Sequence, residues 1–285
     1  MKLLPLLRLF ACALALFALL PAGAQEAPRP FRVGMTPAFL HNQHAMLAEW
    51  KVYLERKLGR PIVFVQRDSY RETMDLIDKG NLDFAWICDY PYLALGKTVR
   101  LLAVASYQSK PFYRSYLIVP AKDTQSASII DLKGKVFAYA DPHSNTGYVV
   151  PRHLLKQAGI DAGGHFRKTF FTWSHAKAIE AVASGLAQGA NIDSYVWDSL
   201  QKVDPQLTAK TRIVWKSPEF GFPPIVADHR VPPADFETFQ KALFGMGDDP
   251  DGRALLAKLN LDGFVAGSPE LYAAVAAMMR ELGEL

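Results

Sequence analysis

Short apolar runs alternate along this chain with longer segments in which apolar residues recur at helical spacing. The short runs, which are typical of buried strands, cover residues 31–35, 62–65, 82–87, 100–107, 113–119, 136–139, 169–171, 187–192, 212–215 and 225–227. The segments with helical spacing cover residues 46–58, 69–77, 147–157, 174–185, 195–203, 236–244 and 271–282. Near-continuous apolar strands that alternate with helices predict sheets covered on both faces, in the α/β class.

These elements fall into two α/β blocks that separate near Pro120. Extended stretches bracketed by prolines, at 116–120 and 216–224, are candidate crossings between two lobes. We expect residues 25–121 and 218–285 to form one lobe and residues 122–217 to form the other. The C-terminal helices would then return to the first lobe.

The first 24 residues have the features of a secretory signal peptide. Lys2 and Arg8 make a basic start, residues 9–20 form an unbroken apolar run, and Ala22-Gly23-Ala24 matches a small-residue cleavage pattern. The apolar run is shorter than the about 20 residues that a membrane-spanning helix needs. We therefore expect cleavage after Ala24 and export of a soluble protein.

Composition and cysteine content narrow the function classes. Half of the residues are apolar and the formal net charge is +4. These values exclude a disordered tail, a collagen-like fibre and a coiled coil, and the charge bias is too small to indicate a nucleic-acid partner. Cys88 alone remains after cleavage, so we expect no internal disulfide, and its place after an apolar run favours packing over reactivity.

The segment Asp141-Pro142-His143-Ser144-Asn145-Thr146-Gly147-Tyr148 follows a predicted strand and opens a predicted helix. A helix N-terminus presents unpaired N–H groups and the positive end of the helix dipole, which together favour an anion. The side chains of Ser144, Asn145 and Thr146 add donors, and Gly147 allows close approach of the backbone. Helix capping is the alternative, although one cap needs only one such residue.

Three further polar residues occupy positions from which they could reach the same ligand. His175 opens a second helix and could donate to a partly ionised oxyanion, which would make affinity depend on pH. Tyr70 lies in the capping box Ser69-Tyr70-Arg71-Glu72 and could donate its phenol. Asp193 follows the strand 187–192, at the edge where open α/β sheets bind ligands. The alternatives are a surface histidine, a core tyrosine ring and a helix cap.

Motifs for catalysis or metal binding do not occur. The sequence contains no G-x-S-x-G elbow, no phosphate-binding G-x-x-x-x-G-K-[ST] loop and no H-E-x-x-H helix. Its histidines also lack the close spacing that is usual in zinc sites. We expect no catalytic residues, no metal and no cofactor.

Several stretches together resemble the phosphate/phosphite/phosphonate-binding (PhnD-like) periplasmic solute-binding proteins of ABC transporters. The matching pieces are YLERKLG (53–59), SY (69–70), GNLDFAW (80–86), DLKGK (131–135), DPHSNTG (141–147) with Pro151, SH (174–175) and VWKSP (214–218). They occur in the expected order over nearly the whole mature chain. The element Asp-Pro-x-Ser-x-[Ser/Thr]-Gly is fairly specific, and the joint pattern is stronger than any one piece.

The resemblance implies a two-lobed type II periplasmic binding protein fold with two hinge crossovers that closes on its ligand. It also implies that Ser144, Asn145 and Thr146 hold the oxyanion together with Tyr70 and His175.

The chain departs from the family pattern at two places. Phe222 stands where family members that bind aminoalkyl phosphonates carry an acid, which favours a ligand with no charged tail. Asp193 keeps an acid near the cleft. The stretch Asp89-Tyr90-Pro91-Tyr92 replaces the family's usual glycine-containing turn, so Tyr92 is carried over only as a weak candidate.

The leading hypothesis is a monomeric periplasmic protein that delivers a small phosphorus oxyanion, such as phosphate, phosphite or a phosphonate, to an inner-membrane ABC permease. A periplasmic sensor that signals to a membrane kinase or cyclase would use the same lobes. A secreted hydrolase is disfavoured because nucleophile motifs are missing. The sequence does not identify the oxyanion.

Overall fold

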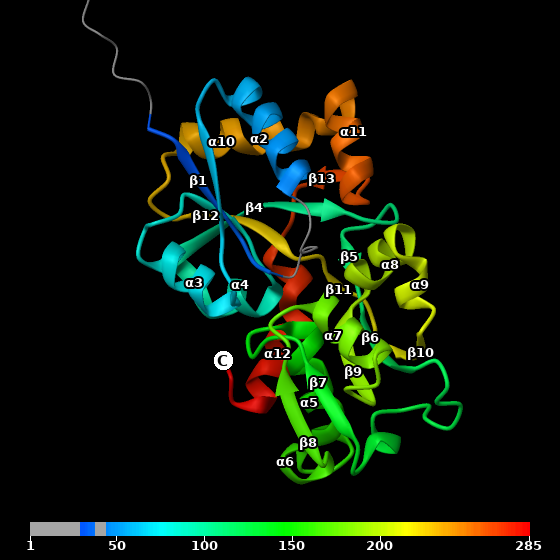
Figure 1. Cartoon of the computed structure of the whole chain (residues 1–285). Helices are drawn as coiled ribbons and strands as arrows, with labels where there is room; N and C mark the ends of the chain where they lie inside the picture. The colour runs from blue at the N-terminus through cyan, green and yellow to red at the C-terminus, as the bar shows by residue number, and fades with distance from the viewer. Residues whose placement is uncertain (1–28, 38–43) are drawn as a thin grey trace, which may run out of the picture.

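Two β-sheets flanked by helices form the upper and lower lobes of the molecule in Figure 1. The computed structural model describes residues 29–37 and 44–285, so the signal peptide predicted at 1–24 lies outside the described residues. Among the described residues, no helix combines the length and the apolar character needed to cross a bilayer.

The first lobe is built on a six-stranded sheet with the order β13-β4-β12-β3-β1-β2. Its strands are β1 (Phe31–Met35), β2 (Ile62–Gln66), β3 (Phe84–Trp86), β4 (Val99–Ser106), β12 (Pro224–Asp228) and β13 (Gly263–Val265). Its helices are α2 (His44–Leu58), α3 (Tyr70–Asp78), α4 (Asp89–Leu95), α10 (Pro233–Phe244) and α11 (Pro250–Leu259). The capping box predicted at Ser69 begins α3: the Glu72 N–H donates to Ser69 Oγ, and the Ser69 N–H donates to the Glu72 carboxylate.

The second lobe is built on a five-stranded sheet with the order β10-β6-β9-β7-β8. Its strands are β6 (Ser115–Pro120), β7 (Val136–Tyr139), β8 (Lys168–Phe171), β9 (Gly189–Asp193) and β10 (Thr211–Lys216). Its helices are α5 (Val150–Gln157), α6 (Ala162–His165), α7 (His175–Ala183), α8 (Ser194–Val203) and α9 (Pro205–Thr208). In both sheets the central strands are buried, as the continuous apolar runs predict.

Two short antiparallel strands, β5 (Phe112–Tyr113) and β11 (Phe220–Gly221), lie where the chain passes between the lobes (Figure 1). The second crossing agrees with the stretch 216–224, but the first does not lie at 116–120. Strand β6 pairs with β9 and β10, so residues 115–120 belong with the second sheet and not with the first, where the sequence division at 121 put them. The reason is that all six residues of β6 are buried in that sheet.

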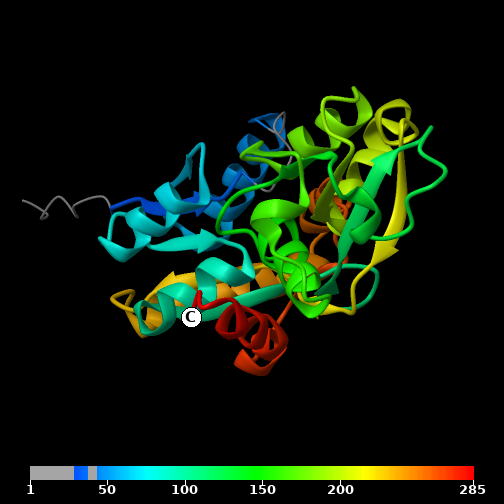
Figure 2. The same ribbon diagram turned by 90° about the horizontal axis from the view of Figure 1, so that it is seen from below.

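The C-terminal helix α12 (Ala273–Leu282) contacts α4 of the first lobe and α5 of the second, which corrects the expectation that it returns to the first lobe alone. In Figure 2 it lies below both lobes. The carboxylate of Glu284, just beyond the helix, accepts a hydrogen bond from Tyr90 of α4 (2.9 Å) and pairs with Arg152 of α5. The apolar pattern did not predict α4, of seven residues, α11, of ten residues, or β13, of three residues.

Candidate functional site

The segment after β7 turns sharply into a buried π-helical turn, η3 (Asn145–Val149), before α5 begins. Ser144, Asn145 and Thr146 are all completely buried. The Gly147 N–H donates to Ser144 Oγ (3.0 Å), so Ser144 caps this turn. A Cβ atom at Gly147 would lie 2.5 Å from the Cβ of Ala140, which only glycine avoids. Single π turns occur often at functional sites because they re-aim side chains.

His175, the first residue of α7, holds Ser144 in place. Its Nδ1 accepts from the backbone N–H of Asp193 (3.1 Å), so the ring proton lies on Nε2, which is 3.2 Å from Ser144 Oγ. Burial lowers the pKa of His175 to about 4, so the ring is neutral. Ser144 Oγ therefore accepts from both His175 and Gly147, and its own hydrogen remains available to a ligand. Both His175 nitrogens face protein groups, so the direct donor role predicted for this ring is not what the geometry provides.

Asp193 is the N-cap of α8. Its Oδ1 accepts from the backbone N–H groups of Tyr195 (2.8 Å) and Val196 (3.4 Å). Burial raises the pKa of this carboxyl to about 7. Of the two interpretations left open by the sequence, the structure supports the helix cap, and Asp193 also orients His175 through its N–H.

A second buried cluster joins the two lobes and the crossing between them. Asn145 Nδ2 of the second lobe donates to Asp89 Oδ2 of the first lobe (2.9 Å). Tyr113, on the crossing strand β5, donates its hydroxyl to the same Asp89 oxygen (2.9 Å). Burial raises the pKa of Asp89 well above its usual range. Sequence reasoning missed Asp89 and Tyr113, although Asp89 follows a buried strand just as Asp193 does.

Four buried polar atoms around these clusters have no hydrogen-bond partner among the described residues: Tyr70 OH, Asp89 Oδ1, Asn145 Oδ1 and Thr146 Oγ1. Tyr70 and Asp89 belong to the first lobe, whereas Asn145 and Thr146 belong to the second. The Tyr70 hydroxyl faces the Ser144 side chain, and burial raises its pKa well above the usual value, so it remains a neutral donor. The two lobes also touch here, since the Tyr70 N–H donates to Asp141 Oδ2 (3.1 Å).

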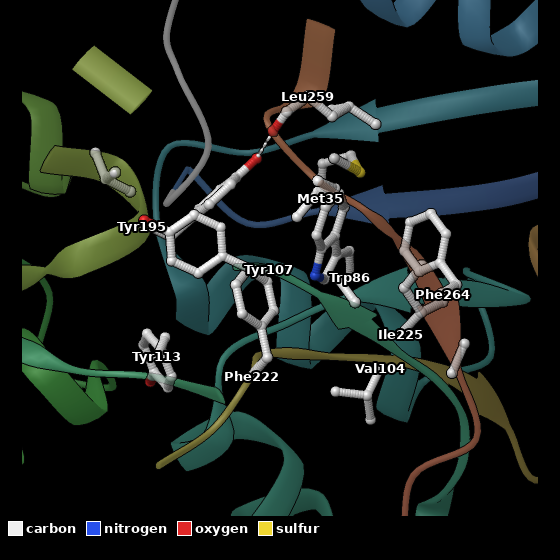
Figure 3. Packing of buried hydrophobic residues seen from close by; sticks show 14 of the residues in the cluster. Met35, Trp86, Val104, Tyr107, Tyr113, Tyr195, Phe222, Ile225, Leu259 and Phe264 are labelled. Carbon is white, nitrogen blue, oxygen red and sulfur yellow. Dashed lines mark hydrogen bonds between the residues drawn. The ribbon is translucent and has the colours of Figure 1, made fainter. Parts of the chain in front are cut away.

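Phe222 lies in an aromatic cluster with Tyr107, Tyr113 and Tyr195 (Figure 3). Its ring centroid is 5.2 Å from that of Tyr195, 5.8 Å from that of Tyr113 and 5.9 Å from that of Tyr107. Phe222 is completely buried, and its backbone carbonyl accepts from Tyr272 OH (3.1 Å). The Phe222 side chain thus contacts the same Tyr113 that binds Asp89.

The Tyr92 side chain packs away from the segment 144–146. It lies on α4, is partly exposed, and packs its ring against Tyr272 with the centroids 4.8 Å apart. The hydrogen bonds of the described residues do not connect it with the segment from Ser144 to Thr146. No group of three or more His, Cys, Asp or Glu side chains among the described residues is placed to hold a metal ion.

The buried neutral His175 should make the folded protein sensitive to acid. The unfolded chain protonates this group near pH 6.5 and the folded protein only near pH 4, so the free energy of unfolding falls as pH drops through that window. Between pH 7.5 and pH 5 the loss from this group is about 2 kcal/mol. His175→Gln should remove it, so urea unfolding should show the variant gaining that amount relative to wild type at pH 5.

Asp193 acts in the opposite direction, because its raised pKa contributes stability at low pH that is lost as pH rises toward 7. It is present in both proteins, so its contribution cancels in the comparison. Parallel pH profiles of wild type and His175→Gln would contradict the assignment of a neutral, buried ring.

The chain matches the family model described as "ABC transporter, phosphonate, periplasmic substrate-binding protein" over residues 33–272. It is 24% identical over 259 residues to a Prochlorococcus marinus protein named as a probable ABC transporter phosphite binding protein, PhnD1, covering 87% of this chain and 82% of that one. It is also 24% identical over 260 residues to the phosphonates-binding periplasmic protein of Escherichia coli K12, covering 87% of this chain and 75% of that one.

The solved structure of Prochlorococcus marinus PhnD1 in complex with methylphosphonate matches with a TM-score of 0.82 at 18% sequence identity, over 90% of this chain and 100% of that chain. A binding protein component of an ABC phosphonate transporter from Pseudomonas aeruginosa also matches with a TM-score of 0.82, at 20% identity, over 90% of this chain and 87% of that chain. These likenesses confirm the predicted two-lobed α/β fold. Because the family model spans most of the sequence, the chain belongs to the phosphonate family of periplasmic substrate-binding proteins of ABC transporters, which are binding proteins and not enzymes.

Proposed function

We propose that this protein binds a small phosphorus oxyanion between its lobes, with Ser144, Thr146 and Tyr70 as donors, and presents it to its membrane permease. The observation that carries the proposal is the set of buried polar atoms without partners where the two lobes meet. Buried hydroxyls are almost always hydrogen-bonded, so donors left unpaired at an interface between lobes indicate a missing acceptor. The names of the relatives, a phosphite binder and a phosphonate binder, favour a phosphorus oxyanion as that acceptor.

The chemistry of the donors fits a tetrahedral anion. Ser144 Oγ accepts from His175 and Gly147, so its hydrogen can turn to a ligand or to the Tyr70 hydroxyl that faces it from the other lobe, and the Thr146 hydroxyl is unpaired. Ser144 and Thr146 belong to the turn at η3 and Tyr70 to α3 of the other lobe, so the three donors can reach separate oxygens of one ligand. Hydrogen bonds to a charged partner are stronger than those between neutral groups. Because donors of both lobes would bind the same ligand, the bound ligand would hold the lobes closed.

Complete burial of these groups requires the lobes to separate before a ligand enters. The crossing strands β5 and β11 are the places where such a motion can occur, and hinge closure around ligand is common in periplasmic binders. We expect the mature protein to begin after Ala24, to act as a monomer in the periplasm, and to dock on its permease in the closed form. His175 and Asp193 then serve as positioning residues for Ser144.

Removing the Thr146 hydroxyl should weaken binding without disturbing the fold. Thr146→Val keeps the shape of the side chain but deletes a donor to a charged ligand, which costs about 1.5–3 kcal/mol, or roughly 10- to 150-fold in affinity. Titration calorimetry with methylphosphonate, phosphite and phosphate measures the loss. Thr146→Ser retains the hydroxyl and should restore most of the affinity. Equal affinities for wild type and Thr146→Val would exclude Thr146 from the site.

The aromatic surroundings of Phe222 should disfavour a ligand with a charged tail. Burying an ammonium group against rings that offer no counter-charge is costly, whereas a methyl group gains about 0.8 kcal/mol. Calorimetry should therefore show tighter binding of methylphosphonate than of 2-aminoethylphosphonate. Phe222→Asp should narrow or reverse that order, and Phe222→Leu, which adds no charge, should keep it. A wild-type preference for the aminoalkyl compound would show that Phe222 does not line the tail pocket.

A further inference from the structure

Asp89 is a completely buried acid with one carboxylate oxygen committed and the other free. Its Oδ2 accepts from Tyr113 OH and from Asn145 Nδ2, each at 2.9 Å. Its Oδ1 has no hydrogen-bond partner among the described residues, and neither has Oδ1 of the adjacent Asn145. Asn145 directly precedes Thr146, and Asp89 directly follows Cys88, which packs against Tyr70, so the two unpaired acceptors belong to chain neighbours of residues at the proposed oxyanion site.

No cation balances this carboxyl among the groups that face it. Cys88 precedes it, Tyr113 faces it from β5, Asn145 from η3, Asp193 from the end of β9, and Tyr272 from η5 (Pro269–Tyr272). Asp193 is itself acidic, and the others are neutral. An unpaired carboxylate is costly to bury, so the free oxygen of Asp89 needs a proton or a hydrogen-bond donor when the lobes are closed.

We propose that Asp89 Oδ1 shares a single proton with one oxygen of the bound anion, so that the protein selects weakly acidic oxyanions and takes up a proton when it binds their dianions. This inference rests on the proposed function and adds the residue that sets its specificity. The proton balance is one solvent proton added to one carboxylate and one ligand dianion. The hydrogen bond forms in the same place whether the acid or the anion carries the proton.

The selectivity follows from where the proton comes from. Burial is the main cause that raises the pKa of Asp89, so opening of the lobes, which returns the side chain to water, would favour its carboxylate form. A phosphate monoester, with a second pKa of about 6, carries the proton in about one-tenth of its molecules at about pH 7. A sulfonate carries none. A phosphorus oxyanion can thus bring the shared proton itself, whereas a sulfonate depends on Asp89 to supply it.

Methylphosphonate and methanesulfonate form a matched pair of probes, because both are tetrahedral and carry one methyl group. For the wild-type protein, calorimetry at pH 8.5 in two buffers of different ionisation enthalpy should show uptake of about one proton per methylphosphonate, and its affinity should fall about tenfold per pH unit above the second ionisation of the ligand. At pH 7, methanesulfonate should bind more weakly than methylphosphonate, because it carries no proton to share with Asp89. Absence of proton uptake in wild type would overturn the proposal without any variant.

Asp89→Asn keeps the shape of the side chain and the contacts at Oδ2 but cannot exchange a proton. It should abolish the proton uptake and bring the affinities for the two probes within a few-fold of each other. Asp251→Asn removes an exposed acid on α11, paired with Arg56, and should change neither quantity. Melting curves of all proteins establish that they are folded.

The outcomes separate this inference from the function on which it rests. If Thr146→Val loses methylphosphonate binding but Asp89→Asn keeps wild-type proton uptake and selectivity, the shared proton is wrong and the oxyanion site stands. If wild type prefers 2-aminoethylphosphonate and Asp89→Asn removes that preference, Asp89 binds an ammonium group and the shared proton is also wrong. If wild type binds no phosphorus oxyanion, the proposed function and this inference fail together.

Discussion

The structure depends on one constraint, which is that polar groups buried between two lobes must find partners. Elsewhere in the two lobes most buried polar groups are satisfied: Asp193 caps α8, Ser69 caps α3, and the Trp86 indole donates to the Pro223 carbonyl (3.0 Å). Where the lobes meet, two donors and two acceptors remain unpaired. Each unpaired group costs about 1–3 kcal/mol, so the closed form without ligand is destabilised at this place. A ligand that satisfies these groups stabilises closure, which couples binding to the shape of the protein.

The neutral state of the buried His175 ring makes the coupling between ligand binding and lobe closure specific. His175 is neutral because burial lowers its pKa, and its Nδ1 is held by the Asp193 N–H, so the ring has one orientation and one tautomer. That orientation fixes Ser144, whose hydrogen then points away from both of its donors. The contacts from Asp193 through His175 to Ser144 link the N-cap of α8 to the N-cap of η3. They thereby orient the Ser144 hydroxyl. No cation takes part in the contacts that join Asp193, His175 and Ser144.

Local features of the site could be predicted from sequence, whereas its assembly could not. The run Ser144-Asn145-Thr146 stands at a junction of strand and helix, and the capping residues Ser69 and Asp193 are visible as motifs, because capping depends on neighbours in the chain. The pairing of Asp89 with Asn145 depends on which edges of two sheets face each other, and that is a long-range property. For the same reason the sequence put residues 116–121 in the first lobe, although β6 completes the second sheet, and it missed that α12 contacts both lobes.

A crystal structure of the protein grown with methylphosphonate would show where the ligand binds. We expect one phosphonate group enclosed between the lobes, with oxygens within about 3.2 Å of Thr146 Oγ1, Ser144 Oγ and Tyr70 OH. We also expect the contacts of His175 with Ser144 and Asp193 to remain unchanged. The proposal would be contradicted if the phosphonate bound elsewhere and the Thr146 hydroxyl stayed unpaired. One such place is the pocket lined by Tyr107, Asp198 and Lys216.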